Sequence, residues 1–295
     1  MLHTRIPGVL QVIKPNGNAA PVVLDSPHSG TEYPADFSCV TPMNIMRKAE
    51  DSFVDELFMA APDCGASLQT ALFPRSYIDP NRSLQDIDAA LLAGPWPESV
   101  CPSEKTRLGH GLVWRICPPG HPIYDRKLEV SEMRNRIEIY WRPYHETLRR
   151  TLDETHERFG EVWHINCHSM PTSVMPYAQG GISGWGDFVL GDRDGSTCST
   201  DFTQFVAETL RGYGYDVRIN DPYKGVELIR AHSDPANGRH GLQIEINRAI
   251  YMDECRLERN GGFAVLQNDM TRLVKAICRH TRDQLTRPGS RNVSS

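Results

Sequence analysis

Two histidines each close a short apolar segment and open a turn of small residues. His28 lies near the end of Pro21-Val-Val-Leu-Asp-Ser-Pro-His28-Ser-Gly30, and His168 near the end of Val162-Trp-His-Ile-Asn-Cys-His168-Ser-Met-Pro171. Each segment is typical of a buried strand, and ligands of α/β proteins bind at the carboxyl ends of strands. One such histidine alone is explained by a backbone hydrogen bond in the turn. Two imidazoles at strand ends, with carboxylates available, predict a divalent-metal site.

A carboxylate stands out within the apolar segment Leu242–Ile246. Ile244 and Ile246 flank Glu245, so strand alternation places Glu245 on the opposite face, together with Gln243 and Asn247. A carboxylate in such a strand is costly to bury unless it is paired or lines a cleft. Two interpretations stay open: a buried salt bridge to an arginine, or a general base that activates water.

Arginines occur in three polar segments. Asp79-Pro-Asn81-Arg82 is typical of a turn, and Asn-Arg recurs at Asn247-Arg248. Turn chemistry alone explains the first segment, but an arginine there is also suited to binding a substrate carboxylate with two hydrogen bonds. Arg230 and His232 form a further polar loop before the Glu245 strand, for which a solvated surface is the simpler interpretation.

Eight cysteines are scattered along the chain without a C-x-x-C pair, which indicates reduced, small buried side chains. Cys167 directly precedes His168, so it is an alternative candidate as a nucleophile. Alternation along the strand turns Cys167 away from the face that Asn166 and His168 share, which disfavours this interpretation.

Composition narrows the function classes. The 295 residues carry a formal net charge of −5 with 39% hydrophobic residues, which is ordinary for a globular protein and does not favour nucleic acid as a partner. No segment approaches the roughly 20 apolar residues that span a bilayer. Met1–Pro7 lacks the apolar stretch of a secretory signal, so we expect a cytoplasmic protein. Oligomeric state is not predicted.

Strand-like and helix-like segments alternate, which predicts an α/β fold with a mostly parallel sheet covered on both faces. We expect a single domain over 1–295, with a core at about 8–285 and a frayed polar tail over 287–295. Residues 93–119 are predicted to be a long surface excursion of the kind that walls or covers active sites. The expected strands are 22–24, 67–73, 162–167, 188–190, 215–219 and 242–246, and the expected helices are 44–61, 128–156 with an interruption at Pro143, 200–212 and 261–280.

Seven motifs in sequence order resemble the N-formylglutamate amidohydrolase family, over about Pro21 to Glu254. Each motif is weak alone, but the ordered set is specific. They are Ser-Pro-His28-Ser-Gly, Asp79-Pro-Asn-Arg82, Trp141-Arg-Pro-Tyr-His145, Asn166-Cys-His168-Ser-Met-Pro, Gly191-Asp-Arg-Asp-Gly195, Pro222-Tyr-Lys-Gly225 and Gln243-Ile-Glu-Ile-Asn-Arg248-Ala-Ile-Tyr-Met-Asp253.

The resemblance implies a central mixed sheet, similar to the zinc carboxypeptidases and aspartoacylase-like hydrolases, and one zinc ion. It implies that His28 and His168 are metal ligands and that Glu245 is the general base. It also implies that Arg82 binds the substrate's carboxylate, and from the polar segments above we expect further substrate-binding roles for Asn81, Arg248 and Arg230. For the carboxylate ligand, position 31 is Thr rather than the Glu of a His-x-x-Glu pattern. Asp51 is therefore preferred, with Glu50 and Glu32 as further candidates.

The implied activity is zinc-dependent hydrolysis of the amide bond of an N-acyl amino acid. N-formyl-L-glutamate, giving formate and glutamate at the end of histidine degradation, is the leading substrate. The segment Val226–Ser233 departs from the family pattern, which continues with a second glycine, an aromatic residue and an Arg-His-Tyr-Gly-like run. The amino acid of the substrate therefore stays open. A deacylase for another N-acyl amino acid and a non-catalytic binding protein are the competing hypotheses.

Overall fold

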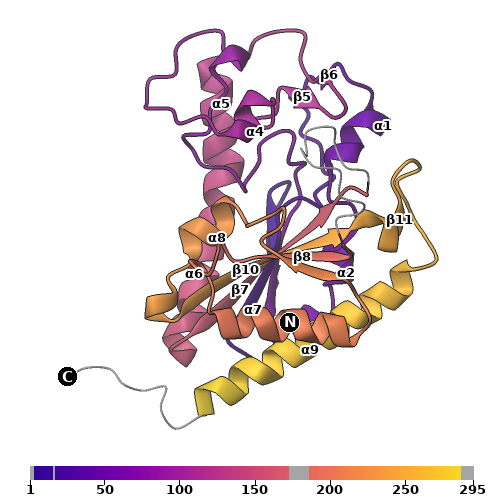
Figure 1. The fold of residues 1–295 in the computed structure, drawn as a ribbon. Coiled ribbons are helices and arrows are strands. Elements are labelled where there is room, and N and C mark those ends of the chain that lie inside the picture. Colours follow the sequence, from indigo (N-terminus) through magenta and orange to yellow (C-terminus); the bar gives the residue numbers. More distant parts are fainter. Residues whose placement is uncertain (1–2, 16, 173–185, 287–295) are drawn as a thin grey trace.

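The computed structural model describes residues 3–15, 17–172 and 186–286, and an eight-stranded sheet forms its centre (Figure 1). The strand order is β1-β2-β4-β3-β7-β10-β8-β9. The pairs β4–β3, β3–β7, β7–β10 and β8–β9 are parallel, whereas β1–β2, β2–β4 and β10–β8 are antiparallel, which confirms the mixed, mostly parallel sheet. The strands are β1 (His3–Ile6), β2 (Leu10–Ile13), β3 (Val22–Ser26), β4 (Ser67–Ala71), β7 (Val162–Met170), β8 (Phe188–Gly191), β9 (Val217–Ile219) and β10 (Arg239–Asn247).

Helices cover both faces of the sheet, and each face has its own apolar core. One core joins residues of α2 (Val54–Leu57), α3 (Ala61–Cys64), α7 (Thr200–Gly212) and α9 (Phe263–Thr286) to the sheet. The other joins the sheet to residues of α5 (Val130–Arg136) and α6 (Arg142–Phe159), with one residue from α8 (Glu227–His232). Alternation along each strand sends successive side chains to the two cores. In Figure 1, α7 and α9 lie on one side of the sheet and α6 on the other.

The connections contain short helices and ribbons. They are α1 (Met43–Met46), α4 (Glu104–Arg107), the 3₁₀ turns Arg47–Ala49, Ala89–Leu91, Pro235–Asn237 and Arg248–Ile250, and the two-residue strands β5 (Ile116–Cys117), β6 (His121–Pro122), β11 (Met252–Asp253) and β12 (Glu258–Arg259). Two of these, α4 and β5, lie in the predicted excursion 93–119.

The predicted helix over Asn44–Ala61 is wrong as a single element. The chain forms α1 and a 3₁₀ turn, leaves helical geometry at Glu50, and forms α2 only after Phe53, whose φ is 66°. The intervening loop is docked on the end of β3, because the Asp51 N–H donates to the His28 carbonyl at 3.0 Å. Apolar residues at helical spacing therefore occur both before and after the bend, and the local sequence does not indicate the bend itself.

The helix predicted over 128–156 is interrupted near Pro143, but by a π-helical turn between two helices rather than by a break in the chain. α5 runs into a π-helical turn (Ile137–Trp141), and α6 begins at Arg142 with Pro143 in its first turn. Proline is tolerated there because the first amides of a helix have no partner within it. The other predicted elements are confirmed within a few residues at their ends, except that α9 continues past the predicted end at His280 to Thr286. Thr200–Gly212 matches α7 at both ends. The strands β1 and β2 at one side of the sheet and the helix α8 are additions to the prediction, and the predicted tail 287–295 lies outside the described residues.

The three central parallel strands bring their carboxyl ends to one edge. In register, Asp25 of β3 pairs with Asn166 of β7, and His168 of β7 pairs with Glu245 of β10. Paired positions of neighbouring parallel strands carry side chains on the same face. The predicted site residues at strand ends are thereby set side by side.

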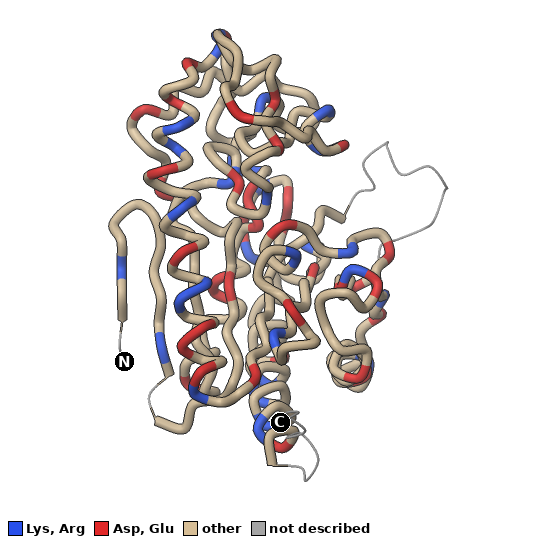
Figure 2. Tube along the Cα trace, turned by 90° about the vertical axis from the view of Figure 1, so that its left-hand side faces the viewer, with Lys and Arg blue, Asp and Glu red and all other residues tan. Residues whose placement is uncertain are grey.

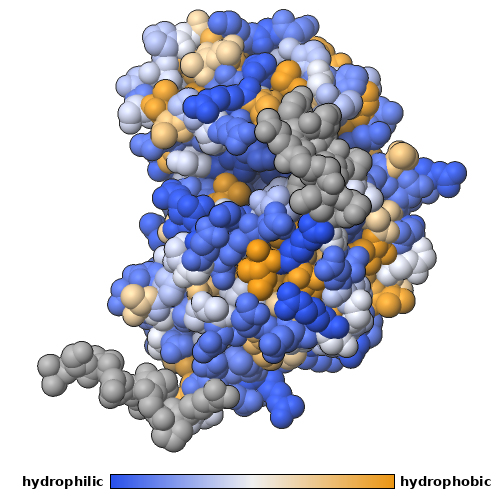
Figure 3. All heavy atoms as spheres, viewed as in Figure 1, coloured by the Kyte–Doolittle hydropathy of each residue, from blue (hydrophilic) through white to orange (hydrophobic). Residues whose placement is uncertain are grey.

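Charged residues of both signs are spread along the traced chain (Figure 2), and hydrophobic residues form only small separate patches on the face seen in Figure 3. Among the described residues, no helix is long and apolar enough to cross a bilayer.

Gly30 provides a test of how the His28 turn is seated. A Cβ at Gly30 would lie 2.3 Å from the Phe73 carbonyl oxygen and 2.6 Å from that of Leu72, which is backbone that cannot swing aside. We expect Gly30→Ala to lower the free energy of unfolding by about 1–3 kcal/mol, as overpacking does. Chemical denaturation measures this change. Gly212→Ala is the matched control, because no atom lies within 4 Å of its Cβ. Equal stability of the two variants would contradict this description of the turn.

Candidate metal centre

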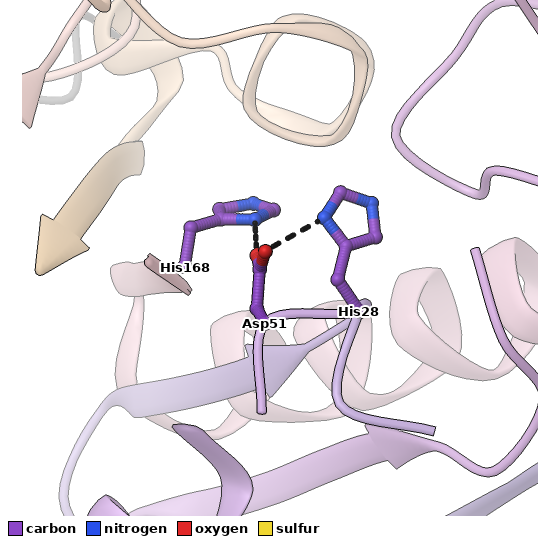
Figure 4. A group of neighbouring side chains, drawn as sticks. All are labelled: His28, Asp51 and His168. Atoms are coloured by element: carbon purple, nitrogen blue, oxygen red, sulfur yellow. Dashed lines mark hydrogen bonds and ion pairs between the residues drawn. The ribbon is translucent and has the colours of Figure 1, made fainter. Parts of the chain in front are cut away.

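Three buried side chains from separate elements converge at the carboxyl edge of the sheet (Figure 4). His28 follows β3, Asp51 lies in the loop after the 3₁₀ turn Arg47–Ala49, and His168 lies near the end of β7. Asp51 Oδ2 is 3.3 Å from His28 Nδ1 and 3.0 Å from His168 Nδ1. One ligand atom from each residue lies within 4.8 Å of the others, and the three residues are at most 2% exposed. The structure thus joins the two predicted histidines with the preferred carboxylate, Asp51.

Glu50 and Glu32, the two further candidates for the carboxylate ligand, are bound by residues outside this group. Glu50 is buried, but its oxygens accept hydrogen bonds from Tyr33 and Arg47. Glu32 pairs with Arg5, and its side chain is 44% exposed. Asp51 is therefore the carboxylate that the structure brings to the histidines.

The hydrogen bond at Nε2 of each imidazole determines whether its Nδ1 is free to bind a cation. The Asp79 carboxylate accepts from His28 Nε2 at 2.7 Å, so that nitrogen carries the proton. Asn166 donates its Nδ2 to Asp25, which turns Asn166 Oδ1 toward His168 Nε2 at 2.7 Å. When both imidazoles are neutral, both Nδ1 lone pairs therefore face the Asp51 oxygen with no proton between them.

This convergence of unshared electron pairs fits a bound cation. Two imidazole nitrogens and a carboxylate oxygen form a ligand set typical of catalytic zinc, which leaves a fourth position open. The hydrogen bonds on the far nitrogens are the outer partners that normally orient histidine ligands.

The carboxylate of Asp51 is shared between the histidines and two arginines. Its Oδ2 faces the imidazoles, whereas its Oδ1 accepts from Arg248 at 3.0 Å and lies 3.5 Å from Arg75. Arg75 also binds Asp79 at 2.9 Å. Burial alone would raise the pKa of Asp79, but the positive charge of Arg75 and the contact with His28 hold that pKa well below its usual value. Asp79 is thus kept ionised beside His28.

Glu245 lies beside this group on β10. It is 9% exposed, and one of its oxygens accepts from Gln243 at 2.9 Å. Burial raises the pKa of Glu245 to about 7, and the charges of Arg75 and Arg248 oppose this increase. Glu245 forms no ion pair among the described residues, so the interpretation as a buried salt bridge is wrong, and its role as a general base stays a prediction.

Arg82 and Asn81 border the same site. Arg82 Nε donates to the His110 carbonyl at 3.0 Å and Nη1 to the Asn81 carbonyl at 2.9 Å, while no described residue accepts a hydrogen bond from Nη2. Asn81 Oδ1 accepts from the Leu228 N–H, and Asn81 Nδ2 lies 3.1 Å from His168 Nε2. The hydrogen bond of that imidazole nitrogen is the shorter contact, 2.7 Å to Asn166 Oδ1, so Asn81 Nδ2 only packs against it. Arg82 is thus the predicted substrate ligand with an available donor.

The remaining two predicted arginines are engaged by the protein. Arg248 reaches Ser169 and the Lys48 carbonyl as well as Asp51, so its guanidinium acts as a support for Asp51. Arg230 binds Glu227 with two hydrogen bonds, and its side chain is 53% exposed. A substrate-binding role for either one stays a prediction.

Sequence reasoning misses two residues of the site. Arg75 follows β4 by a few residues, and the pattern around Asp79 indicates only a turn. A signal for Arg75 is present, because β4 is parallel to β3 and ends at the same edge as the two histidines. The role of Asp79 as a partner of His28 depends on a contact between residues 51 positions apart.

Cys167 is not placed for nucleophilic chemistry. It is fully buried in the core that faces α9, and its Sγ contacts the Ile165 carbonyl. Burial raises the pKa of its thiol well above the usual value. The alternation that turns Cys167 away from His168 is confirmed.

The fold and the site define an α/β protein with a candidate metal centre at the carboxyl edge of its sheet. The family model described as N-formylglutamate amidohydrolase matches residues 20–252. The chain belongs to the N-formylglutamate amidohydrolase family, which makes it an enzyme of the amide-hydrolysing class.

Relatives agree with this assignment. A crystal structure of N-formylglutamate amidohydrolase from Ralstonia eutropha JMP134 is 49% identical, covers 94% of this chain and 99% of that one, and has a TM-score of 0.91. N-formylglutamate deformylase of Pseudomonas putida is 30% identical over 79% of this chain and 82% of the relative. The enzyme of the same name from Pseudomonas aeruginosa is 25% identical over 90% of this chain and 92% of the relative. A gene product of Agrobacterium tumefaciens, 18% identical with a TM-score of 0.62, shares the fold.

The buried position of Cys167 predicts its chemical behaviour. We expect iodoacetamide to alkylate the exposed Cys101 and Cys255 in the native enzyme and to leave Cys167 unmodified, because thiolate formation and access are both suppressed there. Peptide mass mapping identifies the modified positions. Alkylation of Cys167 in parallel with loss of hydrolysis would restore the thiol nucleophile as an explanation.

Proposed function

We propose that this enzyme is a zinc-dependent deformylase that hydrolyses N-formyl-L-glutamate to formate and L-glutamate. The observation that carries the proposal is the buried His28–Asp51–His168 group with Glu245 beside it on the neighbouring strand. The family and its relatives support this substrate. We further propose that the reaction takes place in the cytoplasm and completes histidine degradation.

His28 Nδ1, His168 Nδ1 and an Asp51 oxygen would hold the zinc ion. Bound there, zinc acidifies a water molecule and polarises the formyl carbonyl. Asp79 and Asn166 keep the two imidazoles in the orientation that this binding needs. Arg75 and Arg248 place positive charge beside the same group, where the tetrahedral oxyanion develops.

Glu245 acts as the proton carrier. Its carboxylate removes a proton from the attacking water, whose oxygen forms a bond to the formyl carbon. The same proton then passes to the amide nitrogen as the carbon–nitrogen bond breaks, and glutamate leaves as the amine. The buried position of Glu245 raises its affinity for that proton, which suits a group that must accept and then return it.

Arg82 binds a carboxylate of the substrate. Its Nη2 is the donor left after the backbone contacts of Nε and Nη1, and those contacts hold the guanidinium plane. A preorganised arginine loses little conformational freedom on binding a carboxylate.

Metal content and hydrolysis separate the roles of the ligands and the base. We expect purified protein to contain about one zinc per chain and Glu245→Gln to keep it, while kcat falls by about 10²–10⁴-fold, the size of a lost acid–base group. His168→Ala is expected to lose the metal and the activity together. Elemental analysis and a formate-release assay measure the two quantities.

A substrate panel serves as the control for specificity. N-formyl, N-acetyl and N-succinyl amino acids are compared under the same conditions. Turnover of an N-acetyl or N-succinyl compound in preference to N-formylglutamate would identify another deacylase. Tight binding without any turnover would indicate a binding protein. Wild-type activity of Glu245→Gln in metal-free protein would overturn the mechanism itself.

Arg82 and Arg230 form a matched pair for testing carboxylate binding. We expect Arg82→Met to raise KM for N-formylglutamate by about 10–100-fold, since a charge-assisted hydrogen bond from Nη2 to the substrate carboxylate contributes about 1.5–3 kcal/mol. Arg230→Met should change KM less than twofold, because that guanidinium is exposed and bound to Glu227. Steady-state kinetics decide between them. A larger increase in KM for Arg230→Met than for Arg82→Met would indicate that the substrate carboxylate binds to Arg230 of α8.

A further inference from the structure

Two aromatic side chains at the start of α6 hold the turn that carries Asn81 and Arg82. The Trp141 indole Nε1 donates to the Arg82 carbonyl at 2.9 Å. His145 Nε2 lies 2.7 Å from the Pro80 carbonyl and donates to it. Both residues belong to the motif Trp141-Arg-Pro-Tyr-His145, which has no part in the chemistry above.

The two side chains form one rigid unit. Their rings stack with centroids 3.7 Å apart and an interplanar angle of 17°. They are four positions apart, where helical side chains meet, and Trp141 ends the π-helical turn that precedes α6. Such turns re-aim side chains and occur often at functional sites.

A second helix holds the same turn from the other side. His145 Nδ1 is 3.1 Å from His232 Nε2 of α8. Because Nε2 of His145 carries its proton toward the Pro80 carbonyl, Nδ1 accepts from His232. The Leu228 N–H of α8 also donates to Asn81 Oδ1. Burial lowers the pKa of His145 to about 4 and that of His232 to about 3, so both rings are neutral near pH 7 and this arrangement persists.

The turn leads directly to the candidate metal centre. Asp79 at its start accepts from His28, Asn81 contacts His168, and Arg82 presents its free donor. A displacement of the Pro80 or Arg82 carbonyl would therefore move groups that reach both histidines and the substrate. Errors of about 1 Å at such groups can cost about 100-fold in rate.

We propose that Trp141 and His145 form a positioning clamp that sets Asn81 and Arg82 for substrate binding. Neither residue touches the reacting atoms. The substrate-binding part of this proposal rests on the proposed function, whereas the clamp itself is a property of the folded chain.

The test compares three histidine variants. His145→Phe keeps an aromatic ring against Trp141 but removes the donor, and His145→Gln restores an amide donor near the Nε2 position. His156→Phe is the matched control, because His156 also lies on α6 and contacts a backbone carbonyl, that of Asn237, at 2.9 Å. Binding of N-formylglutamate is measured calorimetrically in zinc-loaded protein that also carries Glu245→Gln. We expect Kd to rise at least tenfold in His145→Phe, to recover partly in His145→Gln and to stay unchanged in His156→Phe.

A second measurement is independent of activity. Hydrogen exchange of the Trp141 indole N–H, identified by the loss of its NMR signal in Trp141→Phe, should be at least tenfold faster in His145→Phe than in wild type or His156→Phe. If His145→Phe does not fold, Trp141→Phe replaces it in the binding experiment with the same expected increase in Kd. Unchanged Kd and exchange in His145→Phe, or equal defects in His145→Phe and His145→Gln, would overturn the clamp. If the wild-type enzyme does not hydrolyse N-formylglutamate but the variants show the expected exchange pattern, the proposed substrate is wrong and the clamp is still supported.

Discussion

The burial of the Asp51 carboxylate is the constraint on which the site depends. An ionised carboxylate at 1% exposure is unfavourable unless charges and hydrogen bonds replace water. The protein surrounds it with two histidines on one oxygen and two arginines on the other. These partners come from four separated parts of the chain, so the carboxylate is satisfied only when the segments after β3, β4 and β10 and the end of β7 all meet at one edge. The same requirement creates a cluster of lone pairs that suits a cation.

Strand ends are predictable from the sequence, whereas the loop that completes the site is not. His28, His168 and Glu245 each lie in or directly after an apolar segment, and the parallel order of β3, β7 and β10 then brings them together. Periodicity places Asp51 in a helix because apolar residues at helical spacing flank it on both sides. The bend at Glu50 to Phe53 depends on contacts with the His28 turn, and local periodicity carries no information about such contacts.

The residues that hydrogen-bond to the far nitrogens of the histidines, such as Asp79, cannot be predicted from the sequence for a related reason. The sequence Asp79-Pro-Asn81-Arg82 is explained fully by turn chemistry, so nothing in it points to His28. Its function appears only when α6 and α8 are seen to hold the turn against β7. Arg248 illustrates the same limit from the other direction: its type and position predict a substrate ligand, and its observed contacts with Ser169 and Asp51 give it a supporting role that the sequence does not indicate. The type of a residue indicates which interactions its side chain can make, and the packing of the folded chain determines which partner it contacts.

The alternating residues of β7 show how the support extends beneath the metal ligands. Tyr144 of α6, His164 and Asn166 all donate to Asp25 of β3, and Asn166 then orients His168. Burial alone would raise the pKa of Asp25, but the charge of His164 and these hydrogen bonds lower it below its usual value. Removing one member would leave a buried polar group unpaired, so each member constrains the next. α6 therefore controls His168 through Tyr144 and the Asn81–Arg82 turn through Trp141 and His145. A single helix end thus fixes both a ligand of the candidate metal and the Asn81–Arg82 turn, and a shift of that end would alter both together.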